Sequence, residues 1–253
     1  MQTGARFSTG SRWLGDWVRP FGYFTGVFTG CELGYGFILA VMQAPEIELK
    51  FPVDDANALQ SKLPELGFHL DTPRTFEHNT LYDSPERSLR AQRQLLRLRK
   101  YGEVWTVTHK RVPGVNEAGA GESKYKVRIE TETAVEDGAA MAEVFVRLGY
   151  GPVFEYEKYR TEWSHPVHVS EGSGLVTGHL VVDETPIGTY AELEGPKEWI
   201  DETIEQLGVD PARCLTDSYG KLFLEWKART GSSAENLVFA EIESSQLSAV
   251  SSR

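Results

Sequence analysis

The stretch from Glu46 to Lys50 alternates charged and apolar side chains at every step. A period of two residues is typical of a β-strand with one buried face, because successive side chains point to opposite sides of a sheet. Ile47 and Leu49 therefore share one face, and Glu46, Glu48 and Lys50 share the other. A chain built from such strands must either expose rows of charge to water or neutralise them inside the fold.

Several later stretches repeat this design, with Arg-x-Arg, Lys-x-Arg or Glu-x-Glu on one face and Leu, Val or Ile on the other. They are separated by Gly, Pro and polar residues, as expected for strands joined by turns. Besides the first strand, we expect strands at Thr80–Asp83, Leu95–Arg99, Val104–Lys110, Lys124–Glu132, about Val153–Trp163, Leu175–Asp183 and Thr189–Glu194.

Helices are expected between some of these strands. Asp54 or Asp55 can cap a helix that ends at Gly67. The apolar spacing predicts further helices from about Val135 to Leu148, from Pro196 to Leu207 and from Pro211 to about Arg229.

The predicted organisation is one domain over residues 43–229 with a segment on either side. Residues 1–42 mix Gly, Thr and aromatic residues without a strand or helix period. We expect a poorly structured extension there, with Met42 as a candidate start of the native protein. Residues 230–253 are rich in Ser and are expected to be disordered.

The composition excludes several classes of function. A formal net charge of -11 argues against general binding to nucleic acid or to an anionic membrane surface, although it leaves room for a local basic pocket. Apolar runs are too short to span a bilayer. Two cysteines are too few for a disulfide framework, which favours a reducing cytoplasm.

The charged faces allow two arrangements. They can be the solvated side of an open antiparallel sheet, or the sheet can close into a barrel with its charges inward and its apolar faces covered by helices. Repetition of Arg-x-Arg, Lys-x-Arg and Glu-x-Glu favours the barrel, because solvated faces usually mix Thr, Ser, Gln and Lys. The helices also need one apolar sheet face to pack against.

Inward charges predict a ligand. Two carboxylates about 7 Å apart repel by about 2 kcal/mol at an effective dielectric near 20. Carboxylate oxygens are the ligands that Mg²⁺ and Mn²⁺ prefer, and Arg and Lys suit phosphate. A tunnel lined by both types therefore suits a polyphosphate chain that is bridged by divalent metal ions.

The ordered motifs resemble the signature of the CYTH superfamily, also called triphosphate tunnel metalloenzymes. This superfamily includes class IV adenylate cyclases, thiamine triphosphatases and inorganic triphosphatases. The resemblance covers about Pro45 to Trp226 and implies a closed eight-stranded antiparallel β-barrel with flanking helices, an α+β fold. Its motifs are Glu46-x-Glu48-x-Lys50, Tyr82-Asp83, Arg97-x-Arg99, Thr106-x-Thr108-x-Lys110, Arg128-x-Glu130-x-Glu132, Lys158-x-Arg160-x-x-Trp163, Asp183-Glu184 and Glu192-x-Glu194-Gly195.

The resemblance also implies roles for individual residues. Glu130 and Glu132 are candidates for orienting basic side chains, and Lys221 is either a phosphate ligand or a solvated helix residue. Lys50, together with Glu46 and Glu48, is placed at the reaction centre. Metal binding is implied for Glu46, Glu48, Asp183, Glu192 and Glu194. Phosphate binding is implied for Lys50, Arg97, Arg99, Lys110, Arg128, Lys158 and Arg160.

The function that follows is an enzyme dependent on Mg²⁺ or Mn²⁺ that hydrolyses an inorganic or organic triphosphate, such as tripolyphosphate, thiamine triphosphate or ATP. One alternative is a class IV adenylate cyclase, which converts ATP to cyclic AMP and pyrophosphate. Another is a polyphosphate-binding module without catalysis. The oligomeric state is left open.

Overall fold

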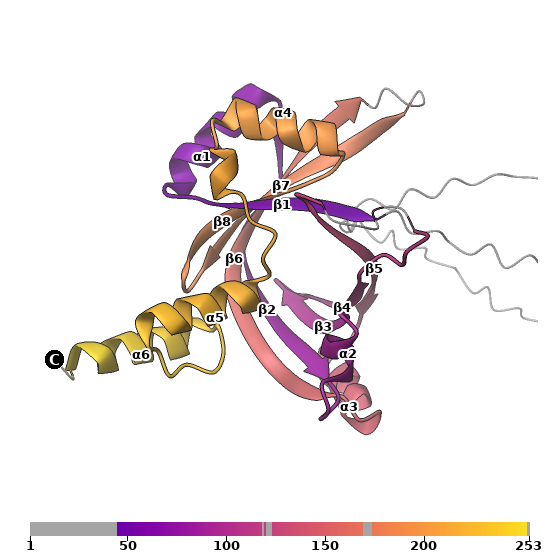
Figure 1. Ribbon diagram of the computed structural model, residues 1–253, viewed down its shortest axis with the longest axis vertical. Helices are drawn as coiled ribbons and strands as arrows, with labels where there is room; N and C mark the ends of the chain where they lie inside the picture. Colours follow the sequence, from indigo (N-terminus) through magenta and orange to yellow (C-terminus); the bar gives the residue numbers. More distant parts are fainter. Residues whose placement is uncertain (1–44, 118, 120–122, 169–173, 252–253) are drawn as a thin grey trace, which may run out of the picture. The chain divides into compact units, whose positions relative to one another are not determined.

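Eight antiparallel strands form a closed barrel in the order β1-β5-β4-β3-β2-β6-β7-β8. The computed structural model describes residues 45–117, 119, 123–168 and 174–251 (Figure 1). The extension expected at residues 1–42 lies outside these ranges. The strands are β1 (Glu46–Pro52), β2 (His69–Asp83), β3 (Leu95–Tyr101), β4 (Val104–Arg111), β5 (Lys126–Val135), β6 (Gly151–His168), β7 (Leu175–Thr185) and β8 (Gly188–Glu194).

The charged faces of the strands point into the barrel. Lys50 and Lys158 are each 2% exposed and Asp183 is fully buried, whereas solvated charges would be open to water. On the opposite face, Leu49 and Leu193 are buried as well. The barrel prediction is confirmed, and the alternative of a solvated open sheet is wrong.

Two helices cover the apolar outer face of β1, β7 and β8. They are α1 (Ala56–Lys62), continued by the 3-10 turn η1 (Leu63–Leu66), and α4 (Lys197–Leu207), and Figure 1 shows both on the same side of the barrel. Asp55 caps α1 by accepting a 2.9 Å hydrogen bond from the Ala58 amide. Leu63 and Ile200 are fully buried in the resulting core. Burial of this apolar surface holds the helices against the sheet.

Two further helices lie near β2 and β3. The short helix α2 (Ser88–Ala91) is held by Asp83, which accepts hydrogen bonds from the amides of Leu89 and Arg90 at 2.9 and 3.0 Å. Helix α3 (Gly138–Arg147) places Phe145 against Leu98. Asp83, part of a sequence motif, therefore has a structural role in this fold.

The C-terminal part of the domain differs from the prediction. One helix was expected from Pro211 to about Arg229, but the chain forms the 3-10 turn η2 (Pro211–Arg213) and then α5 (Tyr219–Thr230). Between them, Leu215 exchanges backbone hydrogen bonds with Lys50 at 2.7 and 3.1 Å. This pairing requires extended backbone, so the helix has to begin later.

Helix α5 packs on inward-facing residues of the barrel. Tyr219 and Phe223 contact Phe154 and Tyr156, which lie on β6 with the same alternation as Lys158. These aromatic side chains fill the lumen where α5 lies. Two of them also contact the charged residues, because the Tyr156 hydroxyl accepts a hydrogen bond from Arg97 and the Tyr219 hydroxyl donates one to Asp183.

The expectation of a disordered tail at residues 230–253 is wrong for its described part. Helix α6 (Phe239–Ser251) forms there, and Leu237 and Ile242 are buried against α5. Leu237 also pairs with β6 through hydrogen bonds of 3.0 Å to the backbones of Glu155 and Glu157. A few apolar residues in a Ser-rich segment are enough for order because they complete an existing core. Within the described ranges, all helices are too short or too polar to cross a membrane.

Candidate active site

Along three strands of the barrel, the inward-facing charged residues follow the same order. Strands β3, β5 and β6 run the same way, because each is separated from the next by one antiparallel neighbour. Along them, cations come first and carboxylates or hydroxyls follow. The inward-facing residues are Arg97, Arg99 and Tyr101 on β3, Lys126, Arg128, Glu130 and Glu132 on β5, and Lys158, Arg160 and Glu162 on β6.

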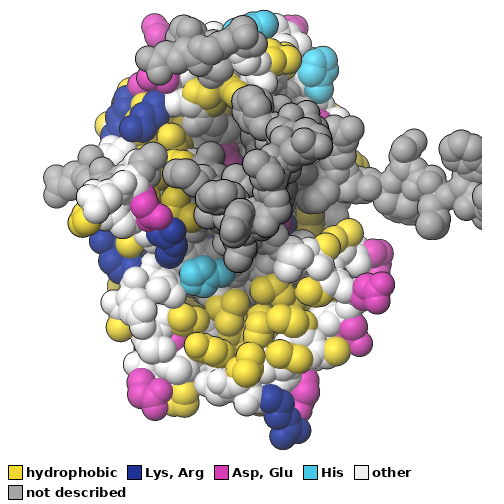
Figure 2. All heavy atoms as spheres, turned by 90° about the vertical axis from the view of Figure 1, so that its right-hand side faces the viewer, with side chains coloured by type: hydrophobic (Ala, Val, Ile, Leu, Met, Phe, Trp, Pro, Cys, Tyr) yellow, Lys and Arg dark blue, Asp and Glu magenta, His cyan; other side chains and the backbone are white. Residues whose placement is uncertain are grey.

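Strand β1 is antiparallel to β5. Along β1 the inward-facing carboxylates come first, Glu46 and Glu48, and the cation Lys50 follows. The register sets Glu46 opposite Arg128 and Glu48 opposite Lys126, so acidic and basic side chains of the two strands face each other inside the lumen. On the face drawn in Figure 2, the described residues present basic, acidic and apolar side chains side by side.

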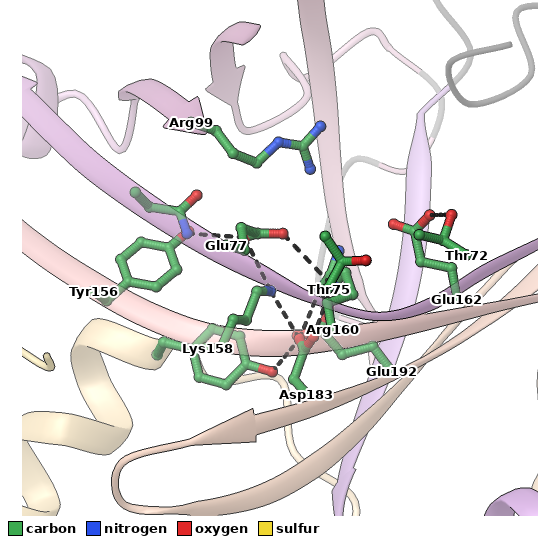
Figure 3. A network of polar contacts seen from close by, with 12 residues as sticks. Thr72, Thr75, Glu77, Arg99, Tyr156, Lys158, Arg160, Glu162, Asp183 and Glu192 are labelled. Carbon is green, nitrogen blue, oxygen red and sulfur yellow. Dashed lines mark hydrogen bonds and ion pairs between the residues drawn. The ribbon is translucent and has the colours of Figure 1, made fainter. Parts of the chain in front are cut away.

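Asp183 lies among buried cations of the lumen (Figure 3). Its carboxylate accepts a hydrogen bond of 2.8 Å from the Lys158 ammonium and bonds of 2.7 and 2.6 Å from the Arg160 guanidinium. The hydroxyl of Tyr219 donates a further bond of 2.6 Å. The Arg160 nitrogen that lies 2.6 Å from Asp183 is also 3.0 Å from Glu192, so Asp183 and Glu192 share this guanidinium. Asp183 thus contacts cations directly, and its role as a metal ligand stays a prediction.

Glu77 is a lumen residue that the sequence analysis missed. It is fully buried on β2, with Lys158 Nζ at 3.4 Å and Arg160 Nε at 3.9 Å. Burial raises the pKa of its carboxyl, but the charges of Lys158, Arg160, Arg99 and Arg97 outweigh it and hold the pKa well below its usual value. Glu77 is therefore an anion that spaces four cations, which we call the cationic cage (Arg97, Arg99, Lys158 and Arg160).

The sequence does contain a pattern that indicates an inward-facing Glu77, but the pattern covers only a few residues. Strand β2 begins at His69, well before the predicted Thr80, and register shifts between Leu70 and Thr75 interrupt its alternation. Counting back by twos from Leu81 gives Asn79 and Glu77, both fully buried. The irregular first half of the strand hid this pattern.

Lys50 has partners on every side. Its ammonium lies 3.0 Å from Glu192, donates a 2.8 Å hydrogen bond to the Asp217 carbonyl and sits 3.9 Å above the centre of the Tyr219 ring. Burial alone would raise the pKa of Glu192, but Lys50 and Arg160 hold it well below its usual value. Tyr219 is a second site residue that was not predicted, although the segment around it, Ser218–Leu222, also resembles the superfamily.

Four carboxylates from β1, β5 and β8 lie close together in the lumen, and we call them the acidic cluster (Glu46, Glu48, Glu130 and Glu194). Lys110 bridges Glu46 and Glu130 at 2.9 and 2.6 Å, and Lys126 pairs with Glu48. Glu194 lies opposite Glu48 in the register of β1 and β8 and makes no hydrogen bond or ion pair with the described residues. Burial and then the charge of Glu46 raise the pKa of Glu194 well above its usual value.

These carboxylates fit a divalent cation. A positive ion beside Glu194 would relieve the repulsion that raises its pKa. Among the described residues, no three Asp, Glu, His or Cys side chains are grouped tightly enough to hold a metal alone. This suits Mg²⁺, which commonly takes one or two protein carboxylates and completes its shell with water and substrate phosphate.

The remaining residues predicted from the sequence make contacts of different kinds. Arg97 and Arg99 lie 3.4 and 2.9 Å from Glu132, so the acidic residues of β5 contact the basic ones, as expected of groups that orient them. Arg128 donates a hydrogen bond to the Val127 carbonyl at 2.8 Å. Lys221 is 58% exposed and pairs with Asp217 on the surface of α5, which supports its interpretation as a solvated helix residue.

Comparison with known proteins identifies relatives over the barrel. The family model of the CYTH domain matches residues 44–211. A protein of Methanocaldococcus jannaschii described as a candidate adenylate cyclase is 25% identical over 180 residues, which are 70% of this chain and 97% of the relative.

Two solved structures share the fold. The PH1819 protein of Pyrococcus horikoshii has a TM-score of 0.53 and 25% identity, and the match covers 72% of this chain and 99% of that one. A candidate adenylate cyclase of Vibrio parahaemolyticus has a TM-score of 0.53 and 19% identity, covering 71% of this chain and 97% of that one.

Proposed function

Because this chain belongs to the CYTH domain family, we propose that it is an enzyme that binds a triphosphate inside the barrel and hydrolyses it with the help of Mg²⁺ or Mn²⁺. The observation that carries the proposal is the arrangement of the lumen. Buried cations on β1, β3 and β6 share the lumen with a cluster of carboxylates. One of these, Glu194, has a raised pKa despite the nearby charge of Lys110, and it makes no hydrogen bond or ion pair with the described residues.

The cations would bind the phosphate oxygens. Arg97, Arg99 and Arg160 can form paired hydrogen bonds to phosphate, and Lys50 and Lys158 act as compact point charges. Their carboxylate partners keep them charged and in place before the substrate arrives. Little reorganisation is then needed when negative charge develops on the transferred phosphoryl group.

The acidic cluster would supply one or two carboxylate ligands to the divalent ion, Glu194 first and Glu46 or Glu48 beside it. Glu192 lies close to Lys50 and Arg160. When bound, such an ion neutralises phosphate charge and can lower the pKa of a coordinated water. The Lys50 ammonium remains a donor to phosphate, since Glu192 and the Tyr219 ring both stabilise its charged form. In hydrolysis, water attacks the terminal phosphorus and the bridging P–O bond breaks. The diphosphate, free or esterified, is the leaving group, and the attacked phosphorus becomes orthophosphate as the water loses its proton.

A second candidate is a class IV adenylate cyclase, which the names of the relatives from M. jannaschii and V. parahaemolyticus favour. In that reaction the ribose 3′-hydroxyl attacks the α-phosphorus of ATP, and pyrophosphate leaves. The same lumen can serve both reactions, because they differ in which phosphorus faces the nucleophile. A cytoplasmic location stays a prediction from the sequence.

One experiment distinguishes these functions. Purified protein is incubated with tripolyphosphate, thiamine triphosphate or ATP in the presence of Mg²⁺ or Mn²⁺, and orthophosphate, pyrophosphate and cyclic AMP are quantified. Orthophosphate supports the triphosphatase, whereas cyclic AMP with equal pyrophosphate supports the cyclase. Tight tripolyphosphate binding without any product would indicate a binding module and would overturn the proposal.

A further inference from the structure

A group of polar side chains without an assigned role lies just beyond the cationic cage. Tyr101 on β3 is the next inward-facing residue after Arg99, and Glu162 on β6 is the next after Arg160. Thr72 lies on β2, the strand between them. Strands β3 and β6 therefore change from cationic to neutral or acidic residues beyond the cage, and β2 places a threonine between them.

The contacts of these residues are incomplete. Glu162 is 8% exposed, and its Oε2 accepts a 2.9 Å hydrogen bond from the Thr72 hydroxyl, which Figure 3 shows beside it. Its other oxygen, Oε1, is buried and has no hydrogen-bond partner among the residues that the structure describes. The Tyr101 hydroxyl is also buried; it interacts with the Thr72 hydroxyl but makes no hydrogen bond of standard geometry with the described residues.

Orphaned polar atoms of this kind are uncommon in folded proteins and point to a missing partner. Here the two atoms are complementary, since Glu162 offers a free acceptor and Tyr101 a hydroxyl that can donate. Burial raises the pKa of the Tyr101 hydroxyl, and the charge of Glu162 raises it further, so Tyr101 remains a neutral donor.

Physical chemistry limits which ligand group can bond to the unpaired oxygen of Glu162. Another phosphate would be repelled by the Glu162 carboxylate, so the phosphate chain must end before this position. A divalent metal is poorly served by one carboxylate and two hydroxyls, since carboxylates dominate such sites. A hydroxyl or amino group of the ligand satisfies Glu162 Oε1 without either conflict.

We propose that Glu162, Tyr101 and Thr72 form a subsite for the organic part of an organic triphosphate, in which a ligand hydroxyl or amino group donates to Glu162. This inference rests on the proposed function, because it takes the triphosphate to occupy the cationic cage. It predicts that the protein prefers a triphosphate ester carrying hydrogen-bond donors over one that lacks them. A site built to bond a donor discriminates strongly against an analogue without it, because the buried acceptor is then left unpaired.

The test compares three probes with Mg²⁺ present. ATP carries ribose hydroxyls and an amino group, methyl triphosphate is an ester without such donors, and tripolyphosphate has no organic group. The variants are E162Q and Y101F. The control is E155Q, because Glu155 lies on the outer face of β6 and is 42% exposed. Product formation gives kcat/KM, and Kd is measured with each probe.

For E162Q we expect kcat/KM and affinity for ATP to fall about tenfold, because a neutral amide oxygen accepts a weaker hydrogen bond than the carboxylate that it replaces. Methyl triphosphate should be unchanged, and tripolyphosphate unchanged or improved because a repulsive charge is gone. Y101F should also lower activity and affinity for ATP relative to methyl triphosphate, by a smaller factor than E162Q. E155Q should behave like wild type with all three.

Equal losses with all three probes would overturn the subsite and indicate a structural or metal-binding role for Glu162. The absence of any change with ATP would also overturn it. Both results leave the proposed function intact if wild-type protein still processes a triphosphate. Wild-type protein that binds none of the probes would overturn the proposed function and the subsite together. The experiment measures the ratio of activities and affinities between probes. A variant that is partly unfolded would lose activity with all probes equally, so it could not give the result expected for the subsite.

Discussion

Tyr219 and Asp183 are joined by a hydrogen bond of 2.6 Å between a helix outside the sheet and a strand of the barrel. The phenol ring of Tyr219 also lies 3.9 Å from the Lys50 ammonium and 5.0 Å from that of Lys158. One side chain of α5 therefore contacts an anion and two cations of the candidate site. The position of α5 and the order of the lumen depend on each other.

The Y219F variant should be less stable than wild type by about 1.5 kcal/mol, the lower end for a hydrogen bond to a charged group. The loss is limited because Lys158 and Arg160 still satisfy Asp183. Urea unfolding followed by fluorescence measures it. Tyr190 packs on the same ring but donates no hydrogen bond to the described residues, so Y190F is the matched control. Equal losses in both variants would argue against a specific role for the hydroxyl.

The contribution of Tyr219 should also depend on pH. Burial, and then the charge of Asp183, raise the pKa of the Tyr219 hydroxyl well above its usual value. A group with a raised folded-state pKa contributes stability that is complete below its unfolded pKa and declines as the pH rises above it. The stability difference between wild type and Y219F should therefore shrink above about pH 10. A constant difference up to the alkaline limit of the measurement would contradict this expectation.

The E77Q variant should lose about 3 kcal/mol of stability, because it leaves a buried cluster of cations without its central anion. The folded-state pKa of Glu77 is depressed, so its contribution is complete above the unfolded value of about 4.5 and declines as the pH falls towards the folded value. Unfolding of wild type and E77Q should accordingly converge in acid. E103Q provides the comparison, because Glu103 lies in the turn between β3 and β4 and is 96% exposed.

In the E194Q variant, the Mg²⁺ or Mn²⁺ concentration for half-maximal activity should rise by about tenfold or more. Glu194 is the carboxylate of the acidic cluster without a partner among the described side chains, so its removal costs metal affinity but little folding energy. Activity is titrated with each metal at saturating substrate, with E198Q on the exposed side of α4 as control. Unchanged metal dependence would remove Glu194 from the proposed metal ligands.

The L237A variant should lose about 3 kcal/mol of stability, as expected for a fully buried leucine, since Leu237 holds the C-terminal segment between β6 and α5. L224A, at a position of α5 that is 54% exposed, should lose about 0.5 kcal/mol or less. Because the same core positions Tyr219, L237A should also lower activity. A variant that loses stability but keeps full activity would show that α5 is held by the barrel alone.

The alternation of side chains along each strand determined much of this protein. Period two assigns Glu46, Lys50, Arg97, Lys158 and Asp183 to one face regardless of the rest of the fold. The need to cover the opposite, apolar face then favours a closed barrel over an open sheet. Both inferences use only neighbouring residues and the cost of burying charge, and such information is local in the chain.

Tertiary structure alone decided which charges meet. Closure of the barrel brings Asp183 against Lys158, Arg160 and Tyr219, and leaves Glu194 among other carboxylates, although both are acidic residues of adjacent strands. The pairing of β2 with β6 places Glu77 against Lys158, and a short apolar run in the tail orders α6. These outcomes depend on strand register and on contacts between residues far apart in sequence, which no local period encodes.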